Sequence, residues 1–140
     1  LPTVNRNIKP ITCPFTGEML AAVPSHRPTV GIVHAQRADR DGNVLVEGIV
    51  GVQKEVVLAS QRTIVTVEEV VDELAAPSPN SVVIPGWTVD AIAEAPGGAR
   101  PSYAHGYYTR DNAFYQEWDA IARDRETFRS WMDEHVMGTP

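Results

Sequence analysis

Short apolar runs separated by turn residues make up most of the first hundred positions. Residues 29–36, TVGIVHAQ, form a mostly β-branched run that is typical of a strand buried on both faces. The DGN turn at 41–43 predicts a reversal, after which VLVEG at 44–48 can return as a second strand. A further buried strand is predicted for RTIVTVEEVV at 62–71. Strands therefore dominate this part of the chain.

Helical spacing occurs in two places. In 52–61, Val52, Val56 and Ala59 are spaced to share one face of a helix. In the tail, apolar residues recur at intervals of three or four residues or their multiples, at Phe114, Trp118, Ile121, Phe128, Met132 and Val136. Asp124 is placed to cap a second helix, and Gly138 stands where a helix would end. The simplest explanation of this apolar stripe is that it belongs to the core.

The remaining segment connects these elements. APSPNS at 76–81 predicts a loop, and residues 82–95 predict two short strands interrupted at Pro85 and Gly86. Strands that alternate with helices indicate an α/β fold with a mixed, largely parallel sheet flanked by helices and a helical carboxyl-terminal tail. No linker divides the chain, so we expect one domain over residues 1–140.

Composition and charge narrow the possible classes of protein. The formal net charge of −6 and the scattered Lys and Arg residues argue against nucleic acid as a partner. No apolar run is long enough to span a membrane, and the amino end has no apolar core of a signal peptide. Cys13 is the only cysteine, which favours the reducing cytoplasm, and we expect it to be a buried apolar thiol. Because the chain begins with Leu1, processing or a missing amino-terminal half has to be considered.

Candidate chemistry begins at the end of the first predicted strand. In HAQRADRDGN at 34–43, Gln36 and Arg37 lie at the carboxyl end of a strand, where open α/β sheets bind ligands. The alternative, favoured when this stretch is taken alone, is that its charged residues only solvate a hairpin.

Glu68 and Glu69 end the strand predicted at 62–71. A carboxylate there could act as a base or nucleophile if its pKa were raised. Adjacent residues of a strand point to opposite faces, so these two cannot form an acid/base pair, and we expect one of them to cap the following turn. VEEVVDEL at 67–74 is also compatible with the acidic first turn of a helix.

The connection at 95–112, APGGARPSYAHGYYTRDN, holds the largest set of polar and aromatic residues. Gly97 and Gly98 permit a close backbone approach, and the tyrosines, Tyr107 among them, add flat surfaces. Hydrogen-bond donors suited to a carboxylate or phosphate come from Arg100, Ser102 and His105. A ligand site and a partner surface remain equally good interpretations, because Tyr and Arg are also enriched at interfaces. The histidines show no paired spacing, so no metal site is predicted.

Three stretches in order resemble the α subunit of the family I CoA-transferases, the glutaconate and 3-oxoacid type. They are ADRDGN at 38–43, GVQKEVVLAS followed by IVTVEEVVDE at 51–73, and VDAIAEAPGGARPSYAHGYY at 89–108. The resemblance covers the carboxyl-terminal half of that polypeptide and implies its α/β fold. It also implies a CoA thioester as substrate, no bound cofactor, and a heteromer that transfers CoA from an acyl-CoA to a free carboxylic acid.

The resemblance implies that the partners are the amino-terminal half of the α subunit together with the β subunit. It also implies that a β-subunit glutamate is the nucleophile, so no catalytic residue is expected here and the isolated chain is expected to be inactive. The candidate residues then form a wall of a shared cleft or a subunit interface: Gln36, Arg37, Glu68, Gly97, Gly98, Arg100, Ser102, His105 and Tyr107. Two alternatives stay open, a related CoA-thioester hydrolase that cleaves a carbon–carbon bond in steroid breakdown and a non-enzymatic interaction domain.

Overall fold

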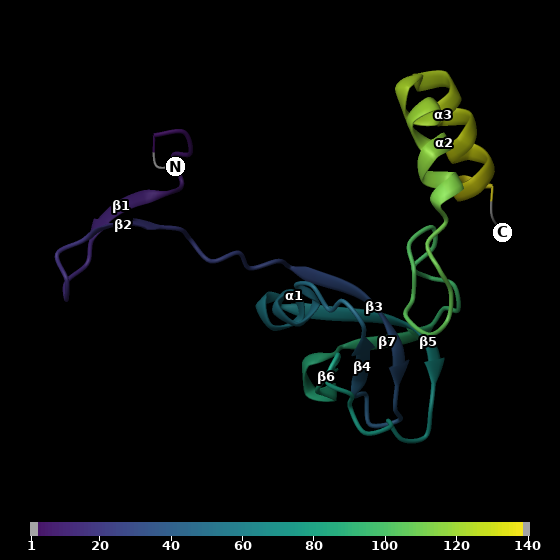
Figure 1. Cartoon of the computed structure of the whole chain (residues 1–140), viewed down its shortest axis with the longest axis horizontal. Helices are drawn as coiled ribbons and strands as arrows, with labels where there is room; N and C mark the ends of the chain where they lie inside the picture. The colour runs from purple at the N-terminus through teal and green to yellow at the C-terminus, as the bar shows by residue number, and fades with distance from the viewer. Residues whose placement is uncertain (1–2, 139–140) are drawn as a thin grey trace.

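A mixed five-stranded sheet forms the body of the protein (Figure 1). The computed structural model describes residues 3–138. The strands lie in the order β6-β4-β3-β5-β7, with β3, β5 and β7 parallel and β4 and β6 antiparallel to their neighbours. Their bounds are β3 Val30–Ala38, β4 Val44–Glu47, β5 Arg62–Val70, β6 Ser81–Ile84 and β7 Ala91–Glu94. The predicted mixed sheet is confirmed.

The two long central strands carry most of the core. Val33 pairs with Val65 and Ala35 with Val67 in the parallel ladder, and all four side chains are buried. Because side chains alternate between the faces of a strand, these four lie on one face, which is apolar in the middle of both strands and ends in Arg37 and Glu69. The stretch 67–74 begins within β5, so its interpretation as a helical turn is wrong.

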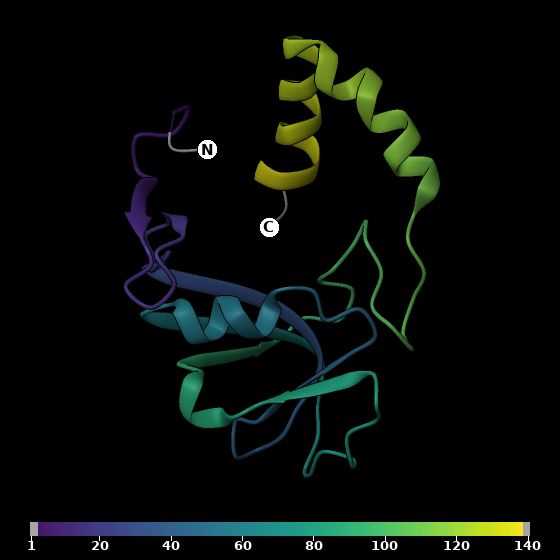
Figure 2. The same ribbon diagram turned by 60° about the vertical axis from the view of Figure 1, so that its left-hand side comes forward.

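Helix α1, Gln53–Ala59, follows β4 and lies against the apolar face of the central strands (Figure 2). Its buried residue is Val57, whereas Val52 is 68% exposed. The predicted helix is confirmed, but only part of its predicted face is right: Val56 packs against the core, whereas Val52 and Ala59 are exposed, because the helix begins after Val52 and turns Val57 toward the sheet. A glycine at position 31 allows this approach, since a Cβ there would lie 3.1 Å from Val56 Cγ1.

The predicted turn at 41–43 is confirmed and has a clear physical cause. Gly42 has a φ of +84°, which other residues rarely adopt, and the Asp39 carboxylate accepts the Asn43 backbone N–H at 2.8 Å. The Asn43 side chain in turn accepts the Gly86 N–H at 3.0 Å. Gly86 lies in a short 3₁₀ turn, η1 Gly86–Thr88, which separates β6 from β7 where the break was predicted.

An amino-terminal hairpin stands apart from the sheet (Figure 1). It consists of β1, Lys9–Thr12, paired antiparallel with β2, Met19–Ala22. Cys13 lies in the connection between these strands and is half-buried. The expectation of a buried apolar thiol is therefore wrong, because the hairpin does not reach the core.

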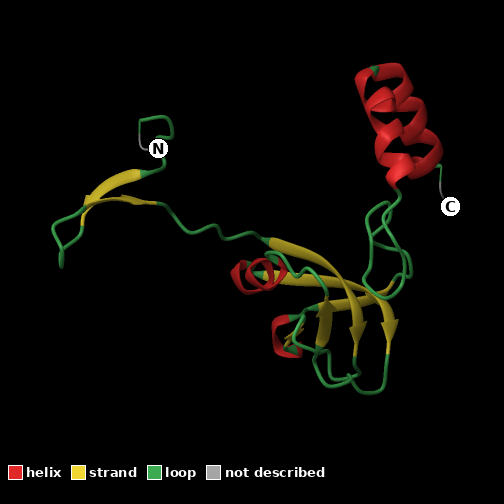
Figure 3. Ribbon diagram, in the orientation of Figure 1, coloured by secondary structure: helices red, strands yellow, loops and turns green. Residues whose placement is uncertain are grey.

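The tail forms a helical hairpin that also projects from the sheet (Figure 3). It contains α2 Asn112–Arg123, α3 Arg125–Met132 and a short π-helical turn, η2 Asp133–Met137. As predicted, Asp124 caps α3, accepting the Thr127 N–H at 2.8 Å. The aromatic residues pack on one another, with the rings of Trp118 and Trp131 4.9 Å apart. None of the α2 or α3 residues is buried, so the assignment of this stripe to the core is wrong.

Among the described residues, no helix combines the length and the apolar character needed to cross a membrane.

Candidate functional site

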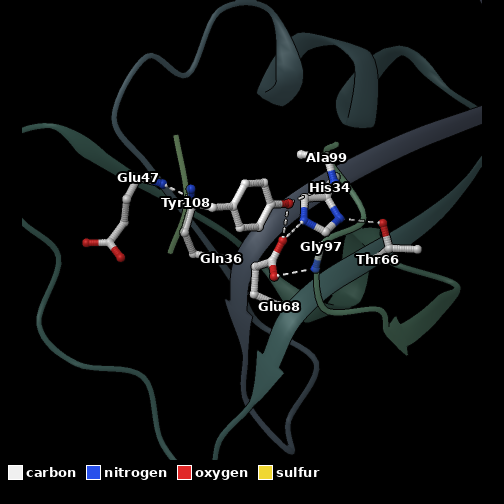
Figure 4. A network of polar contacts seen from close by, with 8 residues as sticks. All are labelled: His34, Gln36, Glu47, Thr66, Glu68, Gly97, Ala99 and Tyr108. Atoms are coloured by element: carbon white, nitrogen blue, oxygen red, sulfur yellow. Dashed lines mark hydrogen bonds and ion pairs between the residues drawn. The ribbon is translucent and has the colours of Figure 1, made fainter. Parts of the chain in front are cut away.

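A network of polar side chains lies where the 95–111 connection folds back over β3 and β5 (Figure 4). His34 pairs with Thr66 in the parallel ladder. Glu68 follows Thr66 by two residues, so its side chain projects from the same face of β5. This face is opposite the one that packs on α1, and it receives Gly97 and Tyr108 from the connection.

Glu68 is the centre of this network. Its Oε1 accepts hydrogen bonds from His34 Nε2 and the Tyr108 hydroxyl, both at 2.6 Å, and its Oε2 accepts the Gly97 N–H at 2.7 Å. The Glu68 side chain is only 3% exposed. A single buried carboxylate thus joins two strands of the sheet to two points of the connection.

Burial raises the pKa of Glu68, but the hydrogen bonds from Tyr108, Gly97 and His34 outweigh burial and leave the pKa below its usual value. The carboxylate is therefore ionised and acts as an acceptor, so the proton between it and His34 belongs to Nε2. The other ring nitrogen, Nδ1, lies 2.8 Å from Thr66 Oγ1. With both nitrogens engaged, His34 positions Glu68 and has no nitrogen free to act as a base.

Tyr108 closes the network from the side of the connection. Its hydroxyl donates to Glu68 and accepts the Ala99 N–H at 2.9 Å. Burial, followed by the hydrogen bond to Glu68, raises the pKa of Tyr108. The Arg100 guanidinium lies over the Tyr108 ring, 4.8 Å from its centroid. These contacts hold the segment from Gly97 to Arg100 against the sheet.

Glu69 makes a second, more exposed set of contacts on the opposite face of β5. Its Oε2 accepts from Arg37 Nε at 3.3 Å and from the Tyr107 hydroxyl at 3.1 Å. Arg37 also lies 3.6 Å from a Glu47 carboxylate oxygen. The predicted opposite orientation of the two glutamates is confirmed. Neither caps the following turn, as one was expected to do, because the described contacts of their carboxylates lead across the sheet to the tyrosines.

The two glycines of the connection allow its close packing. Gly97 has a φ of +82°, which directs its N–H at Glu68. A Cβ at Gly98 would lie 2.8 Å from atoms of the His34 ring. The close approach expected of these glycines is thus made to the sheet itself.

Beside the network lies a pocket of about 420 Å³, here named the α1 pocket, between β3, the start of α1 and the connection. Its apolar wall includes Ile32, Val46, Val52, Val56 and Ala104. Its polar lining consists of His34, Gln36, Glu47, Gln53, Ser102 and Tyr103. Its volume lies within the range of small-molecule sites.

The predicted site residues thus separate into groups. Gln36 and Ser102 line the α1 pocket, and Gln36 Oε1 also accepts the Glu47 N–H at 2.8 Å. Glu68, Gly97 and Gly98 belong to the network described above, and Arg37 and Tyr107 to the Glu69 contacts. Arg100 covers Tyr108, and His105 lies against Gly48 outside the α1 pocket.

The predicted set of site residues lacked His34, Thr66 and Tyr108, which the structure places at the centre. The strand sequences contain a pattern that points to two of these residues, His34 and Thr66. His34 and Gln36, and likewise Thr66 and Glu68, are polar residues at alternate positions in otherwise apolar runs. Such spacing places both members of each pair on one face. Among the residues from 3 to 138, no three His, Cys, Asp or Glu side chains are grouped in a way that could hold a metal ion.

Comparison with known proteins assigns this architecture to a family. The profile of the family described as "Coenzyme A transferase" matches residues 1–95. The chain belongs to the coenzyme A transferase family. It is 66% identical over 139 residues to the A subunit of 3-oxoadipate CoA-transferase from Pseudomonas knackmussii, with 99% of this chain and 49% of that protein covered.

The fold relation agrees with this assignment. The crystal structure of glutaconate coenzyme A-transferase from Acidaminococcus fermentans superposes with a TM-score of 0.82 at 34% identity, over 95% of this chain and 43% of that one. The cholesterol ring-cleaving hydrolase IpdA subunit of Mycobacterium tuberculosis is 28% identical over 141 residues, covering 94% of this chain and 48% of that protein. The chain spans about half the length of the curated relatives it matches.

Proposed function

We propose that the protein is part of the α subunit of a heteromeric CoA-transferase, which moves CoA between an acyl-CoA and a free carboxylic acid. The observation that carries this proposal is the 66% identity with the corresponding subunit of a 3-oxoadipate CoA-transferase across nearly the whole chain. The hydrolase relative is much less similar, at 28% identity, so CoA transfer is favoured over carbon–carbon hydrolysis. By the same relation we propose a short dicarboxylic acid of the 3-oxoadipate type as a substrate.

The proposed nucleophile is a glutamate of a β subunit. It would attack the thioester carbonyl, expel CoA thiolate and form an acyl-glutamyl anhydride, which the thiolate converts to glutamyl-CoA as the first acid leaves. The second acid would then take over the CoA. The contacts of Glu68 support a nucleophile from outside this chain, because both of its oxygens already accept hydrogen bonds within the network.

In this proposal the connection at 95–111 forms a wall of a cleft shared between subunits. The buried network keeps Gly97 and Arg100 in place, and Arg100 would contact an anionic group of the substrate. The exposed hairpin of β1 and β2 and the helical tail would pack on the amino-terminal half of the α subunit or on the β subunit. The single cysteine supports a cytoplasmic location.

Complementation tests the proposed function. We expect the protein alone to show no CoA exchange between an acyl-CoA and 3-oxoadipate. When a β subunit is added together with the amino-terminal half of an α subunit, we expect the acid's CoA thioester to form, as measured by liquid chromatography. Full exchange by the 140-residue protein alone would contradict the proposal. A complete assembly that never exchanges CoA would favour the non-enzymatic alternative.

A further inference from the structure

The α1 pocket has few charged lining residues, although the proposed substrates of the protein are a carboxylic acid and an acyl-CoA. Most of its polar lining residues have uncharged side chains, namely Gln36, Gln53, Ser102 and Tyr103, and His34 adds an imidazole. Among the described residues that line it there is no Lys or Arg, and Glu47 adds a carboxylate. The Glu47 carboxylate already faces Arg37 at 3.6 Å, and the lining offers a carboxylate ligand no cation of its own, so the pocket suits an uncharged ligand.

One lining atom needs a hydrogen-bond donor. Gln53 Oε1 is buried and accepts no hydrogen bond from any residue of the described chain. A buried carbonyl without a donor is unfavourable, and such atoms in native proteins usually have a partner. A ligand N–H or O–H in the pocket would supply it.

We propose that the α1 pocket binds the pantetheine arm of the CoA thioester, with Gln53 Oε1 accepting one of its amide N–H groups. This arm is uncharged, carries two amides and a hydroxyl, and has alkyl segments that suit the apolar wall of Ile32, Val46 and Val56. The phosphates of CoA lie outside the pocket, away from the Glu47 carboxylate. The inference rests on the proposed function, since it assumes a CoA thioester as substrate.

Pantetheine itself is the probe, titrated into the protein by calorimetry. Replacement of Gln53 by leucine keeps the side-chain size and removes the acceptor. We expect the Kd for pantetheine to rise about tenfold, the change that corresponds to about one hydrogen bond. Gln116→Leu, an exposed residue on α2, is the matched control and is expected to leave the Kd unchanged.

A steric variant tests the same site independently of hydrogen bonding. Val52 lines the pocket at the start of α1, so Val52→Trp is expected to fill the space and abolish pantetheine binding. Leu58→Trp, on the same helix but away from this pocket, is the control and should bind like the parent.

Pantetheine that fails to bind the parent, or that binds all four variants equally, would overturn the proposal. Competition by adipate at this site would also overturn it, because the pocket would then accept a carboxylate. Exchange activity in the assembled enzyme is measured separately. Exchange without pantetheine binding would refute the pocket assignment alone, whereas pantetheine binding without exchange would refute the proposed function alone.

Discussion

Replacement of Glu68 by alanine is expected to destabilise the protein by about 3–5 kcal/mol, the range for breaking a buried pair while its partners stay in place. The loss would leave the His34 Nε2–H and the Tyr108 hydroxyl without their acceptor in a site where the Glu68 side chain is 3% exposed. Urea unfolding followed by circular dichroism measures the change. Glu68→Gln, which keeps one acceptor oxygen, is expected to cost less, about 1.5–3 kcal/mol.

The Glu68 contacts also predict a dependence of stability on pH. The pKa of Glu68 is lower in the folded protein than in the unfolded chain, where it is about 4.3. Its stabilising contribution is therefore complete above the unfolded value and is lost as the pH falls through the folded value. We expect the difference in unfolding free energy between the parent and Glu68→Gln to shrink below about pH 4.

Glu69→Ala is the matched control, since Glu69 is the next residue of the same strand and also binds a tyrosine. Its side chain is 50% exposed, and exposed ion pairs contribute only about 0–1 kcal/mol. A similar loss of stability in the two alanine variants would mean that the buried network does not hold the connection to the sheet.

Gly98→Val is expected to give the second large effect. A Cβ at this position would lie 2.8 Å from His34 Nδ1 and 2.9 Å from the Ala95 carbonyl oxygen, which is closer than real Cβ contacts allow. The His34 ring would have to move, and its contact with Thr66 would be lost. Overpacking of this kind costs about 1–3 kcal/mol, and the valine methyl groups add to the clash.

The measurement for Gly98→Val is thermal unfolding together with the CoA exchange rate of the assembled enzyme. We expect both to fall, because the displaced connection also forms one side of the α1 pocket. Ala93→Val, an exposed position of β7, adds the same two methyl groups at a site where a β-branched residue fits a strand. Parent-like unfolding and exchange in Gly98→Val would show that the connection is ordinary surface.

Features set by local sequence were predicted correctly. The β-branched runs became β3 and β5, and the turn at Gly42 and the cap at Asp124 follow from residue types that favour those conformations. Each depends only on neighbours within a few positions. Glu68 was a candidate because it ends an apolar strand, and the structure places it at the centre of the polar network.

Features set by contacts between distant segments were not predicted. Val57 faces the core because α1 packs on β3 and β5, and the helical period alone cannot choose between it and Val52. The apolar residues of the tail have the same helical spacing whether the helices pack on a core or on each other. His34 and Tyr108 both donate hydrogen bonds to Glu68. Tyr108 follows Glu68 by forty residues in the sequence, and no local pattern specifies that the connection folds back to bring it there.

The most direct measurement of the central claim is the position of the covalent CoA adduct. The assembled enzyme is incubated with an acyl-CoA, quenched in acid and digested, and the glutamyl-CoA thioester is located by peptide mass spectrometry. The account predicts the adduct on a glutamate of the β subunit, with none on peptides of this chain. An adduct on Glu47, Glu68 or Glu69 would contradict it, because this chain would then supply the nucleophile.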